Sequence, residues 1–352
     1  MTRLPLSIAE SETDLRGATS GSKSKFRNHI MNKTNSKLYT HPKSSVWVYD
    51  VGKLLRTQSL ESTYQLFFDS LLKKMTPPVD TDPLSVHLVL DRYIEDSTKS
   101  GARKARGESS STRLFVTGFG QSMPETVDEW KSALSNSETK KSFYSLFAEY
   151  VTSGTTTLLY TTIINKEDNT VMIDPRCGTV TNLFHCNHEE ADTRMIYHAS
   201  LQGSQNVVIV ANDSDVLFLG SYACALDKSR RWYYNYEGNS YADLRCIADN
   251  LGEKALYLPI FHSLTGCDTT SYYHFRGKTA PWERALKSPV SLELIRDLGK
   301  DVTISDNTLH DCTEFVRRFL YNGKMDEDLV ATKVRMYVVR RSNCEKIKLL
   351  AS

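Results

Sequence analysis

Apolar residues along the chain recur in two patterns, which alternate from residue 46 onward. Short runs of β-branched and aromatic residues at 46–49, 86–90 and 207–211 predict buried strands. Between them, apolar residues recur at helical spacing over 54–75 and 191–199. The continuous apolar run at 207–211 is typical of a parallel strand that is covered on both faces. Strands that alternate with helices predict an α/β fold with a central, mainly parallel, twisted sheet flanked by helices.

The two ends of the chain lack the alternation. Residues 1–43 are polar and rich in Ser and Thr, with eight Lys or Arg against three Asp or Glu. This composition predicts a mildly basic, mostly disordered tail. Residues 291–352 look helical and carry no motif, so we expect a helical C-terminal extension beyond a main domain at 44–290.

Composition narrows the class of protein. The chain has 352 residues and a net charge of only +2, so any basic, nucleic-acid-binding surface must be local. Its seven cysteines are odd in number, widely spaced and without a CxxC pair, which argues against a disulfide framework and a zinc ribbon. The first residues lack the apolar core that is typical of a secretory leader, and no apolar run approaches the ~18 residues of a membrane span. We therefore expect an intracellular protein, nuclear or cytoplasmic, with no membrane partner.

Acidic residues follow each of the three predicted strands. Asp50 and Asp91 end the first two runs, and Asp213 and Asp215 come directly after the third. Ligands of open α/β sheets bind beyond the carboxyl ends of the strands, so these carboxylates converge if the strands are neighbours. A single acid after a strand is most often a turn former or a helix cap. Three strands that end in this way favour a shared site for a divalent cation, because Mg²⁺ prefers oxygen ligands.

Further acids precede or begin other predicted helices. Glu190 and Asp192 lie in the run HEEAD at the start of the helix predicted from Glu189, where acids also suit the helix dipole. Asp268 lies in LTGCDTTS, where Gly266 permits a tight backbone approach and an ordinary helix cap is the alternative.

Taken in order, these motifs resemble those of the flap endonuclease, XPG and 5′-exonuclease superfamily, which has a PIN-like fold. The motifs are VWVYD with Asp50, HLVLD with Asp91, EEADTRM with Glu190 and Asp192, NDSDV with Asp213 and Asp215, and LTGCDTTS with Asp268. The last three are also similar to a group of animal proteins with this domain, often described as transposon-associated. The resemblance covers residues 44–290. Two departures are Asp192, which replaces the usual Glu, and the helical hairpin, of which only Arg276-Gly277-Lys278 is kept.

The resemblance implies a nuclease that cleaves DNA or RNA with two Mg²⁺ or Mn²⁺ ions. The implied metal-binding and catalytic residues are Asp50, Asp91, Glu190, Asp192, Asp213, Asp215 and Asp268. The segment after the second acid carries the basic residues that it implies for nucleic-acid binding, namely Lys99, Arg103, Lys104 and Arg106. A charge run of this kind is otherwise a solvated surface.

Other functions remain open. The fold can persist as a nucleic-acid-binding or scaffold module without catalysis. A strand followed by Asp213-Ser214-Asp215 also fits an aspartyl-phosphate phosphatase with Asp213 as nucleophile, although this leaves Asp50 and Asp91 unexplained. Zinc at His185, Cys186 and His188 is disfavoured by spacing, and no G-x-S-x-G elbow, P-loop or dinucleotide fingerprint occurs.

Overall fold

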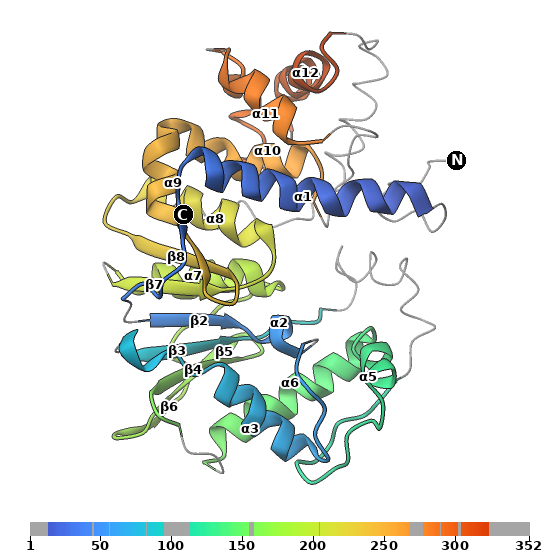
Figure 1. The fold of residues 1–352 in the computed structure, drawn as a ribbon, viewed down its shortest axis with the longest axis vertical. Helices are drawn as coiled ribbons and strands as arrows, with labels where there is room; N and C mark the ends of the chain where they lie inside the picture. The colour runs from blue at the N-terminus through green and yellow to red at the C-terminus, as the bar shows by residue number, and fades with distance from the viewer. Residues whose placement is uncertain are drawn as a thin grey trace.

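A nine-stranded mixed sheet forms the middle of the molecule (Figure 1). The computed structural model describes residues 13–323, apart from 44–45, 56, 82, 95–112, 155–157, 204, 268–276, 289 and 302–303. The described strands are β1 (Lys37–Leu38), β2 (Val46–Asp50), β3 (Ser85–Val89), β4 (Thr161–Lys166), β5 (Asn169–Asp174), β6 (Gly178–Val180), β7 (Asn206–Val210), β8 (Arg231–Glu237) and β9 (Ser240–Asp243). Their order is β1-β9-β8-β7-β2-β3-β4-β5-β6.

The centre of the sheet is parallel and its edges are antiparallel. The strands β8, β7, β2, β3 and β4 run in one direction, whereas β9 and β1 on one side and β5 and β6 on the other pair antiparallel. The predicted α/β class is confirmed, and the predicted parallel arrangement holds for the central strands. The three strands that were predicted from their apolar runs are adjacent in the order β7-β2-β3, with β2 in the middle.

Register brings the ends of these three strands to one level. Asp50 lies opposite Val89 of β3, and Tyr49 lies opposite Val210 of β7. The acids that follow the strands therefore emerge together from one edge of the sheet.

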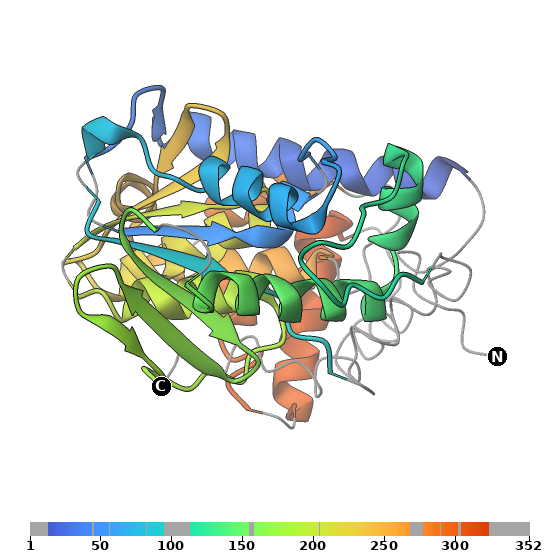
Figure 2. The same ribbon diagram turned by 90° about the horizontal axis from the view of Figure 1, so that it is seen from below.

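Alternate residues of each strand enter two separate cores, because successive side chains point to opposite faces. Val46 and Val48 of β2 belong to one core, and Trp47 and Tyr49 belong to the other. The first core lies under α1 (Thr13–Lys33), α7 (Ala191–Ser200), α8 (Ser214–Leu226), α9 (Leu244–Leu251), α10 (Leu258–Leu264), α11 (Thr279–Leu286) and α12 (Asp306–Phe315). The second lies under α2 (Val51–Leu55), α3 (Tyr64–Lys74), α5 (Val127–Ala133) and α6 (Ser137–Thr152). Figure 2 shows α3 and α6 crossing the second face.

Helix α1 corrects the prediction of a disordered tail for residues 13–43, and residues 1–12 of that predicted tail lie outside the described residues. Phe26, Ile30 and Met31 of α1 are fully buried in the first core. The ring of Phe26 lies 5.2 Å from that of Phe218 on α8, and it also packs against Phe261 and Trp282. The average composition of the segment is polar, but these few apolar residues share one side of the helix. Tertiary packing against α8 therefore stabilises a helix that composition did not predict.

Residues 291–323 continue the first core, and the rest of the predicted C-terminal extension, 324–352, lies outside the described residues. The short helices η4 (Leu292–Ile295) and η5 (Val316–Leu320) flank α12, and Ile295, Cys312 and Phe315 are buried in this core. The ring of Phe315 packs against that of Phe261 on α10. Short 3-10 segments also occur at η1 (Val79–Thr81) and η3 (Gly252–Tyr257). Among the described residues, none of the helices has the length and apolar character needed to cross a lipid bilayer.

Candidate metal centre

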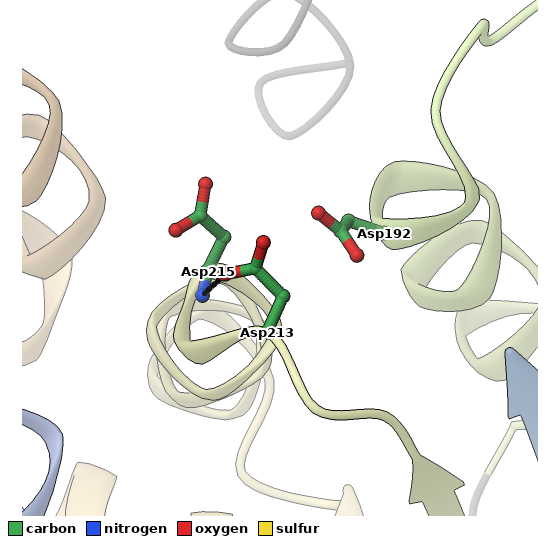
Figure 3. A group of neighbouring side chains, drawn as sticks. All are labelled: Asp192, Asp213 and Asp215. Atoms are coloured by element: carbon green, nitrogen blue, oxygen red, sulfur yellow. Dashed lines mark hydrogen bonds between the residues drawn. The ribbon is translucent and has the colours of Figure 1, made fainter. Parts of the chain in front are cut away.

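Three carboxylates meet at the carboxyl edge of the parallel strands. Asp192, Asp213 and Asp215 each offer an oxygen atom, and these atoms lie within 4.8 Å of one another. Asp215 is buried, and the other two are partly exposed. Figure 3 shows the three side chains projecting from the first turns of α7 and α8 into one shared space. We call these residues the aspartate triad.

The start of α8 fixes two members of the triad. Asp213 has an extended backbone (φ −76°, ψ 130°) and caps the helix, because its Oδ1 accepts a hydrogen bond of 3.0 Å from the Asp215 N–H. The Tyr234 hydroxyl on β8 donates to the Asp213 carbonyl at 3.0 Å. The positive ends of the α7 and α8 dipoles favour carboxylates at both positions. The capped start of α8 therefore fixes Asp213 and Asp215 relative to each other.

A buried histidine and a lysine contact Asp215. The Nε2 atom of His262 lies 2.7 Å from Oδ1 of Asp215, and the Lys23 Nζ lies 3.8 Å from the same oxygen. Burial, and to a smaller extent the charge of Lys278, lower the pKa of His262 to about 4 against the opposing effect of Asp215. The imidazole is therefore neutral near pH 7, and Nε2 must carry the hydrogen that it donates to the carboxylate.

Asp50 and Asp91 form a second acidic group at the same edge, which we call the aspartate pair. Burial and the charge of Asp91 raise the pKa of Asp50 to about 7, although the N–H groups of Lys53 and Gly52 act in the opposite direction. Oδ1 of Asp91 accepts a hydrogen bond of 2.9 Å from the N–H of Ala191. Ala191 begins α7 and directly precedes Asp192, so the pair and the triad meet at the start of this helix.

Lys53 supplies a cation beside the aspartate pair. Its Nζ lies 3.3 Å from the carbonyl oxygen of Ala211, which follows β7, and 3.4 Å from that of Asn235 on β8. Burial lowers the pKa of Lys53 to about 8, while Asp50 and Glu237 raise it. Lys53 therefore lies between Asp50, which ends β2, and the carboxyl ends of β7 and β8.

The structure brings only some of the predicted site residues together in the triad. Glu190 occupies the N-cap position of α7 and is not a member of the triad, whereas Asp192 lies in the first turn. Residues two apart at a helix start do not share a face, which explains the difference. Asp268 and the basic residues Lys99, Arg103, Lys104 and Arg106 lie outside the residues that the structure describes.

Three residues that contact the two acidic groups were not predicted from the sequence. Lys23 lies in the segment taken as a tail, Lys53 follows Asp50 by three residues, and His262 is one of several unremarkable histidines. The spacing of Phe26, Ile30 and Met31 was the available signal for Lys23, because it predicts a helix. No local pattern marks His262, whose partner is 47 residues away.

The donor set of the triad fits a hard divalent cation. Three carboxylates offer only oxygen, which Mg²⁺ and Mn²⁺ prefer, whereas zinc sites usually include His or Cys. Within the described residues, the triad is the only group of three potential ligand side chains that lie close enough to share an ion. The sequence His185-Cys186-Asn187-His188 does not form a second one there.

Comparison with known proteins identified no relative, so a function can be inferred only from the fold and the site. No protein-family model, no curated protein and no solved structure matches this chain.

Proposed function

We propose that this protein is a divalent-metal-dependent nuclease with a PIN-like fold that hydrolyses phosphodiester bonds of DNA or RNA. The observation that carries the proposal is the aspartate triad, whose ligand oxygens lie within 4.8 Å of one another at the carboxyl edge of parallel strands. The order of acidic motifs along the chain, which resembles the flap endonuclease superfamily, supports the same reaction.

The residues of the two acidic groups take distinct parts in this proposal. Asp192, Asp213 and Asp215 hold one Mg²⁺ or Mn²⁺ ion, and the pair Asp50 and Asp91 contributes to a second. Such ions supply an activated water and stabilise the leaving oxygen when they are bound. His262 fixes the orientation of Asp215 by donating to Oδ1.

The arrangement favours a nuclease over an aspartyl-phosphate phosphatase. The phosphatase gives a role to Asp213 and leaves Asp50 and Asp91 without one. Those two acids follow β2 and β3, which belong to the same parallel group as β7. A two-metal nuclease uses all of them.

The decisive experiment is cleavage of end-labelled single-stranded, flapped and duplex DNA and RNA in Mn²⁺ or Mg²⁺. We expect the wild-type protein to cleave at least one substrate and the Asp213→Asn/Asp215→Asn variant to cleave none. A matched control, Asp128→Asn/Asp301→Asn, removes the same charge from two exposed positions and should retain activity. Absence of cleavage by the wild-type protein on every substrate, with unchanged binding in the variant, would leave a non-catalytic binding module.

A further inference from the structure

Helix α1 brings basic side chains to the aspartate triad. The Lys23 side chain is 20% exposed, and its Nζ lies 3.8 Å from Oδ1 of Asp215. Figure 1 shows α1 running alongside α8, with its N-terminal half reaching past the sheet on the side to which the β2 arrow points. This is the edge at which the triad lies.

Arg27 follows Lys23 by one helical turn. Residues four apart in a helix are neighbours on its surface, with Cβ atoms about 5–6 Å apart. The Arg27 guanidinium lies 4.9 Å from the ring centroid of Tyr236 on β8. Its charge also acts on Tyr234, whose pKa burial raises and the guanidinium lowers to a smaller extent, and the Tyr234 hydroxyl donates to the Asp213 carbonyl. The two cations therefore form a short basic row that begins at the triad and continues along β8.

The position of this row is set by the core. Phe26 lies between Lys23 and Arg27 in sequence and packs against Phe218 of α8, the same helix that carries Asp215. At the far end of α1, the Lys33 Nζ lies 2.6 Å from an oxygen of Glu283 on α11. The basic row is thus fixed relative to the triad, as a binding site requires. Lys25 is exposed and lies off this row, so it serves as an internal control.

We infer that Lys23 and Arg27 bind the phosphates that flank the scissile phosphodiester of a nucleic-acid strand. This inference rests on the proposed function and names two substrate-positioning residues for it. Asp215 draws the Lys23 ammonium to the edge of the site, and a cation held by the triad leaves that ammonium facing the incoming phosphate. Arg27 suits the next phosphate, because its planar guanidinium can bind two oxygens at once.

The test is binding of fluorescently labelled oligothymidylate and oligouridylate, measured by anisotropy in Ca²⁺, with a gel to confirm that the strands stay intact. We expect Lys23→Gln and Arg27→Gln each to weaken binding several-fold. Each should also reduce the slope of log affinity against log salt by about 0.7, the value for one phosphate contact on a single strand. Lys23→Arg should restore binding, and Lys25→Gln should change neither quantity.

A second measurement separates phosphate binding from simple charge compensation. If Lys23 only neutralises Asp215, Lys23→Gln will tighten Mn²⁺ binding in calorimetry and leave oligonucleotide affinity and its salt slope unchanged. That result would overturn the inference. Thermal melting of each variant identifies any loss that comes from detachment of α1.

The outcomes also distinguish this inference from the proposed function. Metal-dependent cleavage that is indifferent to Lys23→Gln and Arg27→Gln would sink the inference and preserve the nuclease. Weakened oligonucleotide binding in these variants, in a protein that cleaves nothing, would preserve the inference and remove the nuclease. A wild-type protein that binds no oligonucleotide would contradict both.

Discussion

The aspartate triad and the aspartate pair lie at the same edge of the sheet, but their charges are balanced in different ways. The triad faces a donated hydrogen bond from His262, the Lys23 ammonium and the N-termini of two helices. In the pair, the N–H groups of Gly52 and Lys53 favour the ionised form of Asp50, yet burial and Asp91 outweigh them and raise its pKa to about 7.

One edge of the sheet can therefore hold two kinds of acidic site. The triad has donors that orient its carboxylates and a neighbouring ammonium that partly offsets their negative charge. Asp50 instead lies in surroundings where one proton or one cation relieves repulsion from Asp91. We therefore expect the triad to bind a divalent ion first and the pair to bind more weakly, in competition with protons.

The largest expected effect is on Mn²⁺ binding. Calorimetry of the wild-type protein should show a tight step and a weak step. Asp213→Asn should weaken the tight step about a hundredfold, because it removes a charged ligand, while the amide oxygen of Asn can still cap α8. Asp50→Asn should affect mainly the weak step, and the exposed Asp128→Asn should affect neither. Equal weakening of both steps by either variant would show that the two acidic groups act as one site.

The next effect is a pH dependence of stability in EDTA. Because the folded-state pKa of Asp50 is raised from 3.8 to about 7, the folded state holds this proton more tightly than the unfolded state. Ionised Asp50 therefore destabilises the fold, by an amount that is absent below about pH 4, grows as pH rises and is complete above about pH 7. At about 1.4 kcal/mol per pKa unit, the penalty reaches a few kcal/mol.

Asp50→Asn should remove this penalty. Urea unfolding in EDTA should find the variant more stable than the wild-type protein at about pH 8 and nearly equal to it at about pH 4. Asp128→Asn, at an exposed position, should show no such trend. A variant that is less stable than the wild-type protein at about pH 8 would mean that the ionised carboxylate contributes to the fold.

The sequence predicts that the acids lie together at the ends of the parallel strands. It does not predict which of them form the triad and which form the pair. Runs of apolar residues that end in Asp50, Asp91 and Asp213 are enough to place these acids at strand ends, and parallel neighbours bring them together. Which acids share one ligand space depends on where α7 starts. That start is fixed by the long-range bond from Ala191 to Asp91, which no local pattern encodes.

Helix α1 shows a second limit of sequence reasoning. Average composition over residues 1–43 is dominated by polar residues, so the three apolar residues that dock the helix carried little weight. Their burial against Phe218, Phe261 and Trp282 depends on α8, α10 and α11, which lie roughly two hundred residues away in sequence. Contacts such as Lys23 to Asp215 follow from that packing and become visible only with it.

A smaller effect should separate the orientation of the triad from its charge. His262→Leu removes the donor to Asp215 and should weaken the tight Mn²⁺ step about tenfold, within the range for partners that orient metal ligands. His262→Gln keeps a donor group and should recover part of the affinity. The weak step should stay unchanged in both. If both variants lose stability in urea but bind Mn²⁺ normally, His262 serves only the core.

The smallest effect concerns Lys53, which lies beside the pair as Lys23 lies beside the triad. Asp50 raises the pKa of Lys53 against its burial, so the two charges attract, and Lys53→Gln leaves the pair more negative. We expect the weak Mn²⁺ step to tighten about threefold, as suits a partly screened interaction worth under 1 kcal/mol. The tight step should not change, and the exposed Lys73→Gln should change neither step.

The difference between Lys53→Gln and the wild-type protein should become smaller with added salt, because salt screens the repulsion between Lys53 and the bound ion. A weaker step in Lys53→Gln would show instead that the lysine holds Asp50 in its binding position, which would make the pair as preorganised as the triad.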